Sequence, residues 1–247
     1  MIEASDVIGF LERDGPFIAV LAVAAWLGLL SLGRLYRSYR DSGRERMGLY
    51  IVIVLQTWMF LLIFLAYTYW ARVVVAGQPW SATLSEIGLT APISPNDLMF
   101  WSGALLISWY GLVWLFTALQ KSLGLSPTQA RLFLQPRTVS ETAVFSLVVA
   151  PTAGFCEEVF FRGYLVSFLM RTQEEWLAIV VAASLFGIAH LAQGVTGMVA
   201  SGLMAASAAW MFVVTGSIWP AIAAHTLYNM SAPFLFDVRG QEDQTSA

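Results

Sequence analysis

The chain has 247 residues, of which 58% are hydrophobic and only 12% are charged, and its formal net charge at pH 7 is −3. A soluble globular domain carries about 25% charged residues, so lipid has to cover much of this protein's surface. Its 10 Trp and 8 Tyr suit two membrane–water interfaces, where amphipathic rings settle. The composition therefore predicts an integral membrane protein. Because no basic tract with interleaved aromatic residues is present, we expect no nucleic-acid partner.

Two local features at the start of the chain and in its middle limit the possibilities further. The first fifteen residues are acidic rather than basic, which argues against a cleaved signal peptide and predicts that the first apolar segment is retained as a helix. The single cysteine, Cys156, excludes an intramolecular disulfide and a multi-cysteine metal site. We expect Cys156 to be a small buried residue rather than a nucleophile.

Apolar runs of about 20 residues are long enough to cross the hydrocarbon core as helices, and strands with open edges are excluded from lipid. The fold class predicted is therefore all-α, a polytopic bundle of about seven transmembrane spans. The candidate spans are 16–33, 48–71, 98–119, 141–170, 176–192, 195–215 and 218–236. Substantial loops are expected at 72–97 and 120–138.

The distribution of basic residues predicts the orientation in the membrane, because short cytoplasmic loops are enriched in Lys and Arg. Segment 34–46 contains five arginines, and loop 120–138 contains Lys121, Arg131 and Arg137. Both should be cytoplasmic, which places the N-terminus outside and the C-terminus inside. Twelve of the thirteen basic residues are arginines, a composition that favours a prokaryotic protein of the plasma (inner) membrane.

Three of the apolar segments contain polar or ionisable residues, which are costly in lipid and usually functional there. Segment 154–163 reads GFCEEVFFRG, segment 185–190 reads LFGIAH, and segment 217–230 reads SIWPAIAAHTLYNM. Both histidines of the chain, His190 and His225, lie in these segments. We therefore expect the three segments to contribute to one buried site.

The spacing of the two adjacent carboxylates predicts different roles for them. Glu158 and Arg162 are four residues apart, so they share a helix face and can form an ion pair. Glu157 is rotated by roughly 100° around the helix and should point elsewhere, free for chemistry. The pairs Phe186/His190 and His225/Asn229 have the same four-residue spacing, although packing alone would also explain Phe186.

Depth along the helices gives an independent indication of a common site. At 1.5 Å per residue, Glu157, His190 and Asn229 all lie roughly 18–24 Å from the outer ends of their helices. Counted from residue 141, however, Glu157 would lie too far from the cytoplasm. A helix break at Pro151 and Gly154 would remove this difficulty, and we expect one there.

The three motifs in this order, Glu157-Glu158-x-x-x-Arg162, Phe186-x-x-x-His190 and His225-x-x-x-Asn229, resemble those of the CPBP intramembrane proteases. That family comprises the CAAX-processing and bacteriocin-processing (Abi) enzymes and includes the Ras-converting CAAX endopeptidase type. The resemblance divides the chain into N-terminal helices and loops (1–139), a catalytic membrane core (140–236) and a polar tail (237–247).

The resemblance implies a glutamic-type endopeptidase that cleaves a membrane-embedded or lipidated peptide or protein in contact with membrane lipid. Glu157 would be the general base, His190 would hold and polarise the water, and His225 with Asn229 would stabilise the oxyanion. The remaining motif residues would shape the site: Glu158, Arg162 and Phe186. Substrate identity and oligomeric state are not predicted.

Three alternatives remain open at this stage. We expect no metal, since the chain has no HExxH motif and Asn229 suits an oxyanion better than zinc, but one Glu and two His could form a zinc site. A proton relay or transporter could also use membrane Glu and His residues, although no inverted repeat is visible. A catalytically idle scaffold or immunity factor is the third possibility.

Overall fold

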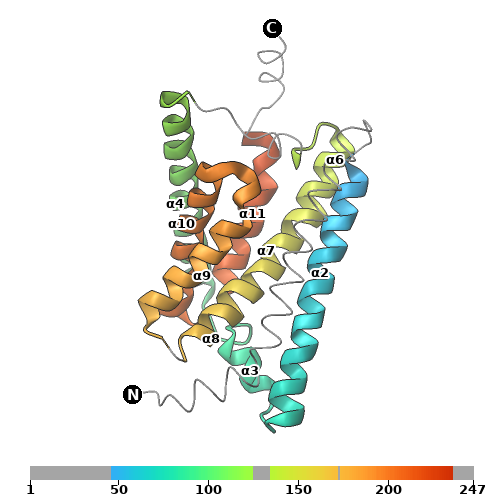
Figure 1. The fold of residues 1–247 in the computed structure, drawn as a ribbon, viewed down its shortest axis with the longest axis vertical. Helices are drawn as coiled ribbons and strands as arrows, with labels where there is room; N and C mark the ends of the chain where they lie inside the picture. Colours follow the sequence, from blue (N-terminus) through green and yellow to red (C-terminus); the bar gives the residue numbers. More distant parts are fainter. Residues whose placement is uncertain (1–45, 125–133, 172, 236–247) are drawn as a thin grey trace. The chain divides into compact units, whose positions relative to one another are not determined.

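The computed structural model describes residues 46–124, 134–171 and 173–235, and every regular element within these ranges is helical. The chain divides into two units, residues 1–49 and 50–247, and all the predicted site residues belong to the second, which is described below. The elements, shown in Figure 1, are α2 (Met47–Tyr69), η1 (Trp70–Val75, π-helical), α3 (Trp80–Glu86), α4 (Pro95–Ser122), α6 (Val139–Val144), η2 (Phe145–Val149, π-helical), α7 (Ala150–Glu158), η3 (Val159–Val166, π-helical), α8 (Ser167–Leu169), α9 (Glu175–Ala189), η4 (Leu191–Gln193, 3₁₀), α10 (Gly194–Thr215) and α11 (Trp219–Leu235).

Four helices of the described residues are long and apolar enough to cross a membrane: Met47–Val75, Pro95–Ser122, Val139–Leu169 and Gly194–Thr215. They correspond to four of the predicted spans. The predicted span 176–192 is observed as the helix α9, of 15 residues. The predicted span 218–236 is observed as α11, which continues to the last described residue, Leu235. The predicted span 16–33 lies outside the described residues. An all-helical fold with helices able to cross a membrane is thus confirmed for the described residues, whereas the number seven and the orientation of the termini remain predictions.

The break expected at Pro151 is absent, because the helix runs without interruption from Val139 to Leu169. A π-helical turn directly precedes the proline, with the Ala150 N–H bonded to the Phe145 carbonyl. A wider turn of this kind leaves room for the proline ring and tolerates the missing backbone hydrogen bond, since proline has no N–H to donate.

The depth of Glu157 in the membrane is explained by the length of this helix instead. A helix of 31 residues is about 45 Å long, longer than the roughly 30 Å core, so counting from its first residue misplaces Glu157.

Gly154 has a packing role instead of a helix-breaking one. A Cβ atom at this position would lie 2.2 Å from Thr226 Oγ1 and 2.9 Å from the Thr226 backbone nitrogen. Glycine therefore lets α7 and α11 approach until their backbones nearly touch, as small residues do between membrane helices. This close approach brings the first and third motifs together.

The helices α4, α10 and α11 share a buried apolar cluster that fixes the other side of the site. It contains three alanines, two methionines, a leucine and a tryptophan: Leu105, Trp109, Met204, Ala208, Met211, Ala221 and Ala224. The Trp109 indole N–H donates a hydrogen bond to Ser207 Oγ at 2.9 Å. The packing and this bond hold α4 against α10.

The segment between η1 and α4, which the sequence predicts as a loop, contains the short helix α3 and lies against one end of the bundle (Figure 1). Glu86 forms ion pairs with Arg72, at 3.2 Å, and with Arg171. A Cβ on Gly163 would lie 2.8 Å from the Ile87 carbonyl oxygen, so this segment also packs closely on η3.

Candidate active site

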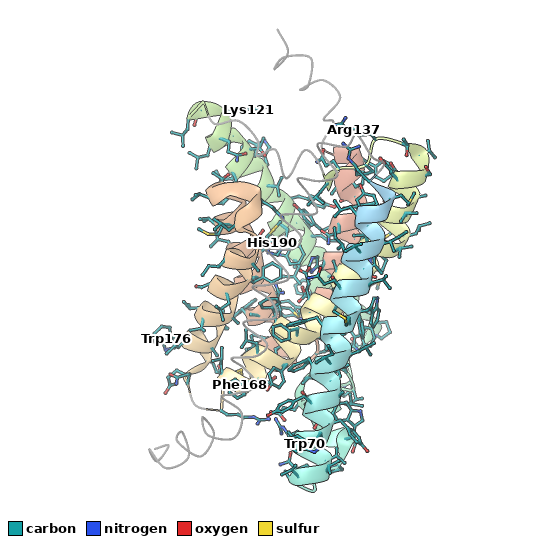
Figure 2. All side chains as sticks on the ribbon, turned by 45° about the vertical axis from the view of Figure 1, so that its right-hand side comes forward. Trp70, Lys121, Arg137, Phe168, Trp176 and His190 are labelled. Carbon is teal, nitrogen blue, oxygen red and sulfur yellow. The ribbon has the colours of Figure 1, made fainter. Side chains whose placement is uncertain are left out.

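One cavity of about 270 Å³ is lined by all four residues for which a catalytic role is predicted. Glu157 lies near the end of α7, His190 caps the C-terminus of α9, and His225 and Asn229 lie one turn apart on α11. In Figure 2, His190 lies in the interior, between the end of the bundle that carries Lys121 and Arg137 and the end that carries Trp70, Phe168 and Trp176. The structure thus brings these four residues together, while their catalytic roles remain predictions.

The predicted ion pair between Glu158 and Arg162 is present and buried. Arg162 Nη1 lies 3.0 Å from Glu158 Oε1, and the two side chains are 2% and 0% exposed. The contact is electrostatic rather than a well-aligned hydrogen bond, since neither Arg162 Nη1 nor Glu158 Oε2 has a hydrogen-bond partner among the described residues. Glu158 does not line the cavity, so the two adjacent carboxylates face different surroundings, as the 100° rotation predicts.

His225 lies between the two carboxylates, an arrangement that the sequence motifs do not reveal. Its Nδ1–H donates to Glu158 Oε1 at 2.7 Å, and its Nε2 lies 3.9 Å from Glu157 Oε2. The bond to Glu158 fixes the orientation of the ring. It also directs Nε2 toward the carboxylate of Glu157.

The Phe186 side chain connects the ion pair to His190. The Phe186 and His190 rings stack with centroids 4.4 Å apart and planes 27° apart, and the Arg162 guanidinium carbon lies 4.5 Å from the Phe186 centroid. This second contact is a cation–π interaction. Phe186 is buried, as expected of a packing residue, but its contacts show that it also positions the motif residues on either side.

The hydrogen bond made by His190 determines what its other nitrogen can do. His190 Nδ1 lies 2.8 Å from the Phe186 carbonyl oxygen, and because a carbonyl only accepts, Nδ1 must carry the proton. In the neutral ring, Nε2 is then a hydrogen-bond acceptor. A water molecule in the cavity could therefore donate to it.

Glu157 offers an unpaired carboxylate oxygen at this site. Its Oε2 is buried and has no hydrogen-bond partner among the described residues, although the side chain as a whole is 29% exposed. The 3.9 Å separation from His225 Nε2 is too long for a direct hydrogen bond, and because Oε2 is buried, water meets the Glu157 side chain at its exposed part. Cys156, next to Glu157, is buried and does not line the cavity, which agrees with its prediction as a small packing residue.

Several residues around the site were missed because they belong to no motif. Trp109 of α4 packs edge-on against the His225 ring, with centroids 6.0 Å apart. One stripe of α4 forms a wall of the cavity: Val113, Phe116, Thr117 and Gln120. The spacing i, i+3, i+4, i+7, with two polar residues in an apolar span, is a signal that could have indicated this wall.

No three His, Cys, Asp or Glu side chains within residues 46–124, 134–171 and 173–235 are grouped so that they could hold a metal ion. Two histidines and one glutamate nevertheless reach the same cavity. The donor types therefore match those of zinc sites, although their positions in the described residues do not form one.

The helical bundle with four helices able to span a membrane places this chain among the integral membrane proteins. Residues 139–231 match the family model described as type II CAAX prenyl endopeptidase Rce1-like. The match confirms the resemblance to the CAAX-processing proteases, and all seven motif residues lie within it. Comparisons with curated proteins and with solved structures gave no match.

Proposed function

We propose that this protein is a glutamic-type intramembrane endopeptidase that hydrolyses a peptide bond in a lipidated or membrane-embedded substrate. The observation that carries the proposal is the unpaired Glu157 Oε2 in the cavity, 3.9 Å from His225 Nε2. A general base must lie within hydrogen-bond reach of the water that it activates. The Rce1-like domain supports the substrate class, since its family is described as prenyl endopeptidases.

In the proposed reaction, the Glu157 carboxylate takes a proton from water while the water oxygen attacks the scissile carbonyl carbon. The electron pair of the carbonyl double bond moves to its oxygen and forms a tetrahedral oxyanion. When the C–N bond breaks, the carbonyl re-forms and protonated Glu157 gives its proton to the leaving nitrogen. Glu157 thus ends the cycle as a carboxylate, and one water molecule has been consumed.

The histidine contacts support distinct roles for the two rings. His190 donates through Nδ1 to a carbonyl, so its Nε2 accepts a hydrogen bond from the attacking water. His225 donates through Nδ1 to Glu158, so it can donate through Nε2 only as an imidazolium. The negative charge of the oxyanion would balance the imidazolium, because Glu158 already neutralises Arg162. Asn229, on the same cavity wall, would supply an amide N–H to the oxyanion.

Replacement of the proposed base tests the function. Glu157→Gln keeps the side-chain volume but removes the base, and we expect turnover to fall at least about 100-fold with an unchanged melting temperature. Turnover is measured in detergent with a fluorogenic peptide that ends in a farnesylated cysteine and three further residues. Glu175→Gln, at an exposed carboxylate at the start of α9, is the matched control and should leave turnover unchanged. Comparable activity of the Glu157→Gln and wild-type proteins would refute the mechanism, and inactivity of the wild-type protein would favour the scaffold or transport alternatives.

One observation favours a zinc-dependent peptidase as a second candidate. Histidines that bind metal usually donate their other ring N–H to a carboxylate or carbonyl oxygen, as His190 and His225 both do. In that case His190, His225 and Glu157 would hold the metal, and they would have to move closer together, since they do not form a metal-binding group in the described residues. Bound there, zinc would lower the pKa of a water molecule and polarise the scissile carbonyl.

A further inference from the structure

The reaction proposed at Glu157 limits the conformation of a peptide bound beside it. In an α-helix each carbonyl oxygen accepts a hydrogen bond from the N–H four residues further along the chain, and the side chains surround the backbone. A scissile carbonyl in that state is open neither to the attacking water nor to the donors that stabilise the oxyanion. A substrate segment that reaches Glu157 therefore has to be unwound and extended.

An extended segment brings into the cavity backbone groups that no longer pair with one another. Each N–H and C=O that the protein covers without supplying a partner destabilises the complex. The cavity must therefore supply hydrogen-bonding groups to the substrate backbone as well as apolar surface to its side chains. The wall contributed by α4, with Val113 and Phe116, supplies apolar surface.

Gln135 has an amide that suits the substrate backbone. It lines the cavity, and its Oε1 is buried with no hydrogen-bond partner among the described residues. The neighbouring carbonyl of Leu134 accepts a hydrogen bond of 2.8 Å from the Tyr50 hydroxyl. This bond anchors the backbone next to Gln135, which limits the region that its amide can reach.

A second glutamine that lines the cavity differs from Gln135 because its amide already has a hydrogen-bond partner within the protein. Gln120 of α4 donates to Thr196 Oγ1 of α10, so it already has a structural partner and joins two helices. Gln135 also lies outside the Rce1-like match, which begins at residue 139, so the family motifs assign it no role. A buried oxygen without a partner in a substrate-sized cavity indicates an acceptor for a ligand N–H.

We propose that Gln135 is a substrate-binding residue that accepts a hydrogen bond from a backbone N–H of an extended substrate segment near the scissile bond. The proposal rests on the proposed function for the identity of the ligand. It adds that the enzyme selects segments that can unwind, such as flexible C-terminal tails, over stable transmembrane helices.

The test measures peptide binding rather than turnover, so that it stands apart from the mechanism. Binding of a fluorescent farnesylated peptide is measured by anisotropy in the Glu157→Gln background. A set of otherwise identical peptides carries a single backbone ester in place of one amide N–H, moved one position at a time around the scissile bond. We expect one ester position to weaken binding about 5- to 30-fold.

Adding Gln135→Met, which keeps the length but removes the acceptor, should weaken binding of the all-amide peptide by a similar factor and abolish the effect of that one ester. Gln135→Glu keeps an acceptor and should bind the all-amide peptide more tightly than Gln135→Met. Gln173→Met, at an exposed position after α8, is the control and should change nothing. Equal ester effects with and without Gln135, or no binding of the all-amide peptide, would overturn the proposal. Failure of the proposed function would appear separately, as unchanged turnover of Glu157→Gln.

Discussion

Glu157 and Glu158 are adjacent in the sequence, yet they have different surroundings. Glu158 is fully buried against Arg162 and His225, whereas Glu157 faces the cavity with one oxygen unpaired. The cause is the helix itself, which separates neighbouring side chains by about 100°. One carboxylate can thus neutralise the arginine and orient a histidine while the other remains available to water.

Removing Glu158 should destabilise the protein as well as inactivate it. Glu158→Gln leaves Arg162 buried without its counter-ion, and breaking a buried pair in this way costs about 3–5 kcal/mol. Arg162→Gln should give a similar loss, and the double variant Glu158→Gln/Arg162→Gln should recover part of it. The measurement is the melting temperature of the three variants in one detergent.

Turnover of the same variants separates the contribution of the Glu158–Arg162 ion pair to stability from the contribution of Glu158 to activity. The double variant should remain inactive, because His225 has lost the carboxylate that accepts its Nδ1–H. Additive destabilisation by the two single changes would mean that the pair does not couple. A Glu157→Gln variant less stable than Glu158→Gln would contradict the division of roles between the carboxylates.

The choice between a metal-free and a zinc-dependent reaction also depends on these few residues. If Glu157 acts as a base on metal-free water, turnover should survive dialysis against a strong chelator. Metal content and activity are measured on the same purified sample. Stoichiometric zinc, lost with activity on chelation and restored with it on zinc addition, would establish the alternative.

Among the helices, the contact between α7 and α11 is the one that assembles the site. Gly154 allows it, because any larger residue would meet the backbone of Thr226. The contact carries His225 to Glu158, 67 residues apart in the sequence. Backbone atoms cannot move aside as flexible side chains can.

Gly154→Ala should therefore separate the two helices. We expect a loss of stability of about 1–3 kcal/mol, typical of overpacking, together with a fall in turnover as His225 moves from Glu158. Gly103→Ala in α4 is the matched control, since a Cβ there meets nothing within 4 Å. The melting temperatures of both variants are compared, and equal effects would show that the α7–α11 contact is not critical.

Across the whole molecule, the orientation in the membrane determines from which side a substrate reaches the cavity. Lys121 and Arg137 lie at one end of the described bundle, and Trp70, Phe168 and Trp176 lie at the other (Figure 2). The loop between Lys121 and Arg137 is predicted to be cytoplasmic because of its basic residues. The cavity would then lie on the cytoplasmic side of the segment around α3.

Cysteine labelling in intact cells or vesicles tests this orientation. Lys121→Cys should be protected from a membrane-impermeant reagent added outside, and Gln78→Cys should react; both positions are exposed. The predicted cytoplasmic arginine segment, which lies largely outside the described residues, is tested in the same way at residue 40. Cys156 is buried and should contribute little background. External labelling of position 121 or 40 would reverse the orientation.

The sequence by itself determined the helical membrane architecture and the residues most relevant to chemistry. Hydropathy over about 20 residues decides whether a segment can enter lipid, and a spacing of four along a helix decides which neighbours share a face. These local rules suffice for the Glu158–Arg162 ion pair and the Phe186–His190 stack. The same rules could not count the spans securely, since α9 is shorter than its apolar run suggests.

Only the tertiary structure decided the contacts between helices. The bond from His225 to Glu158, the wall contributed by α4 and the Gln135 Oε1 atom, which has no partner among the described residues, all depend on how separate segments are rotated and how closely they approach. Pro151 and Gly154 show why local rules fail here. Read alone, both residues indicate a helix break, but a π-helical turn accommodates the proline and the backbone of Thr226 occupies the space beside the glycine.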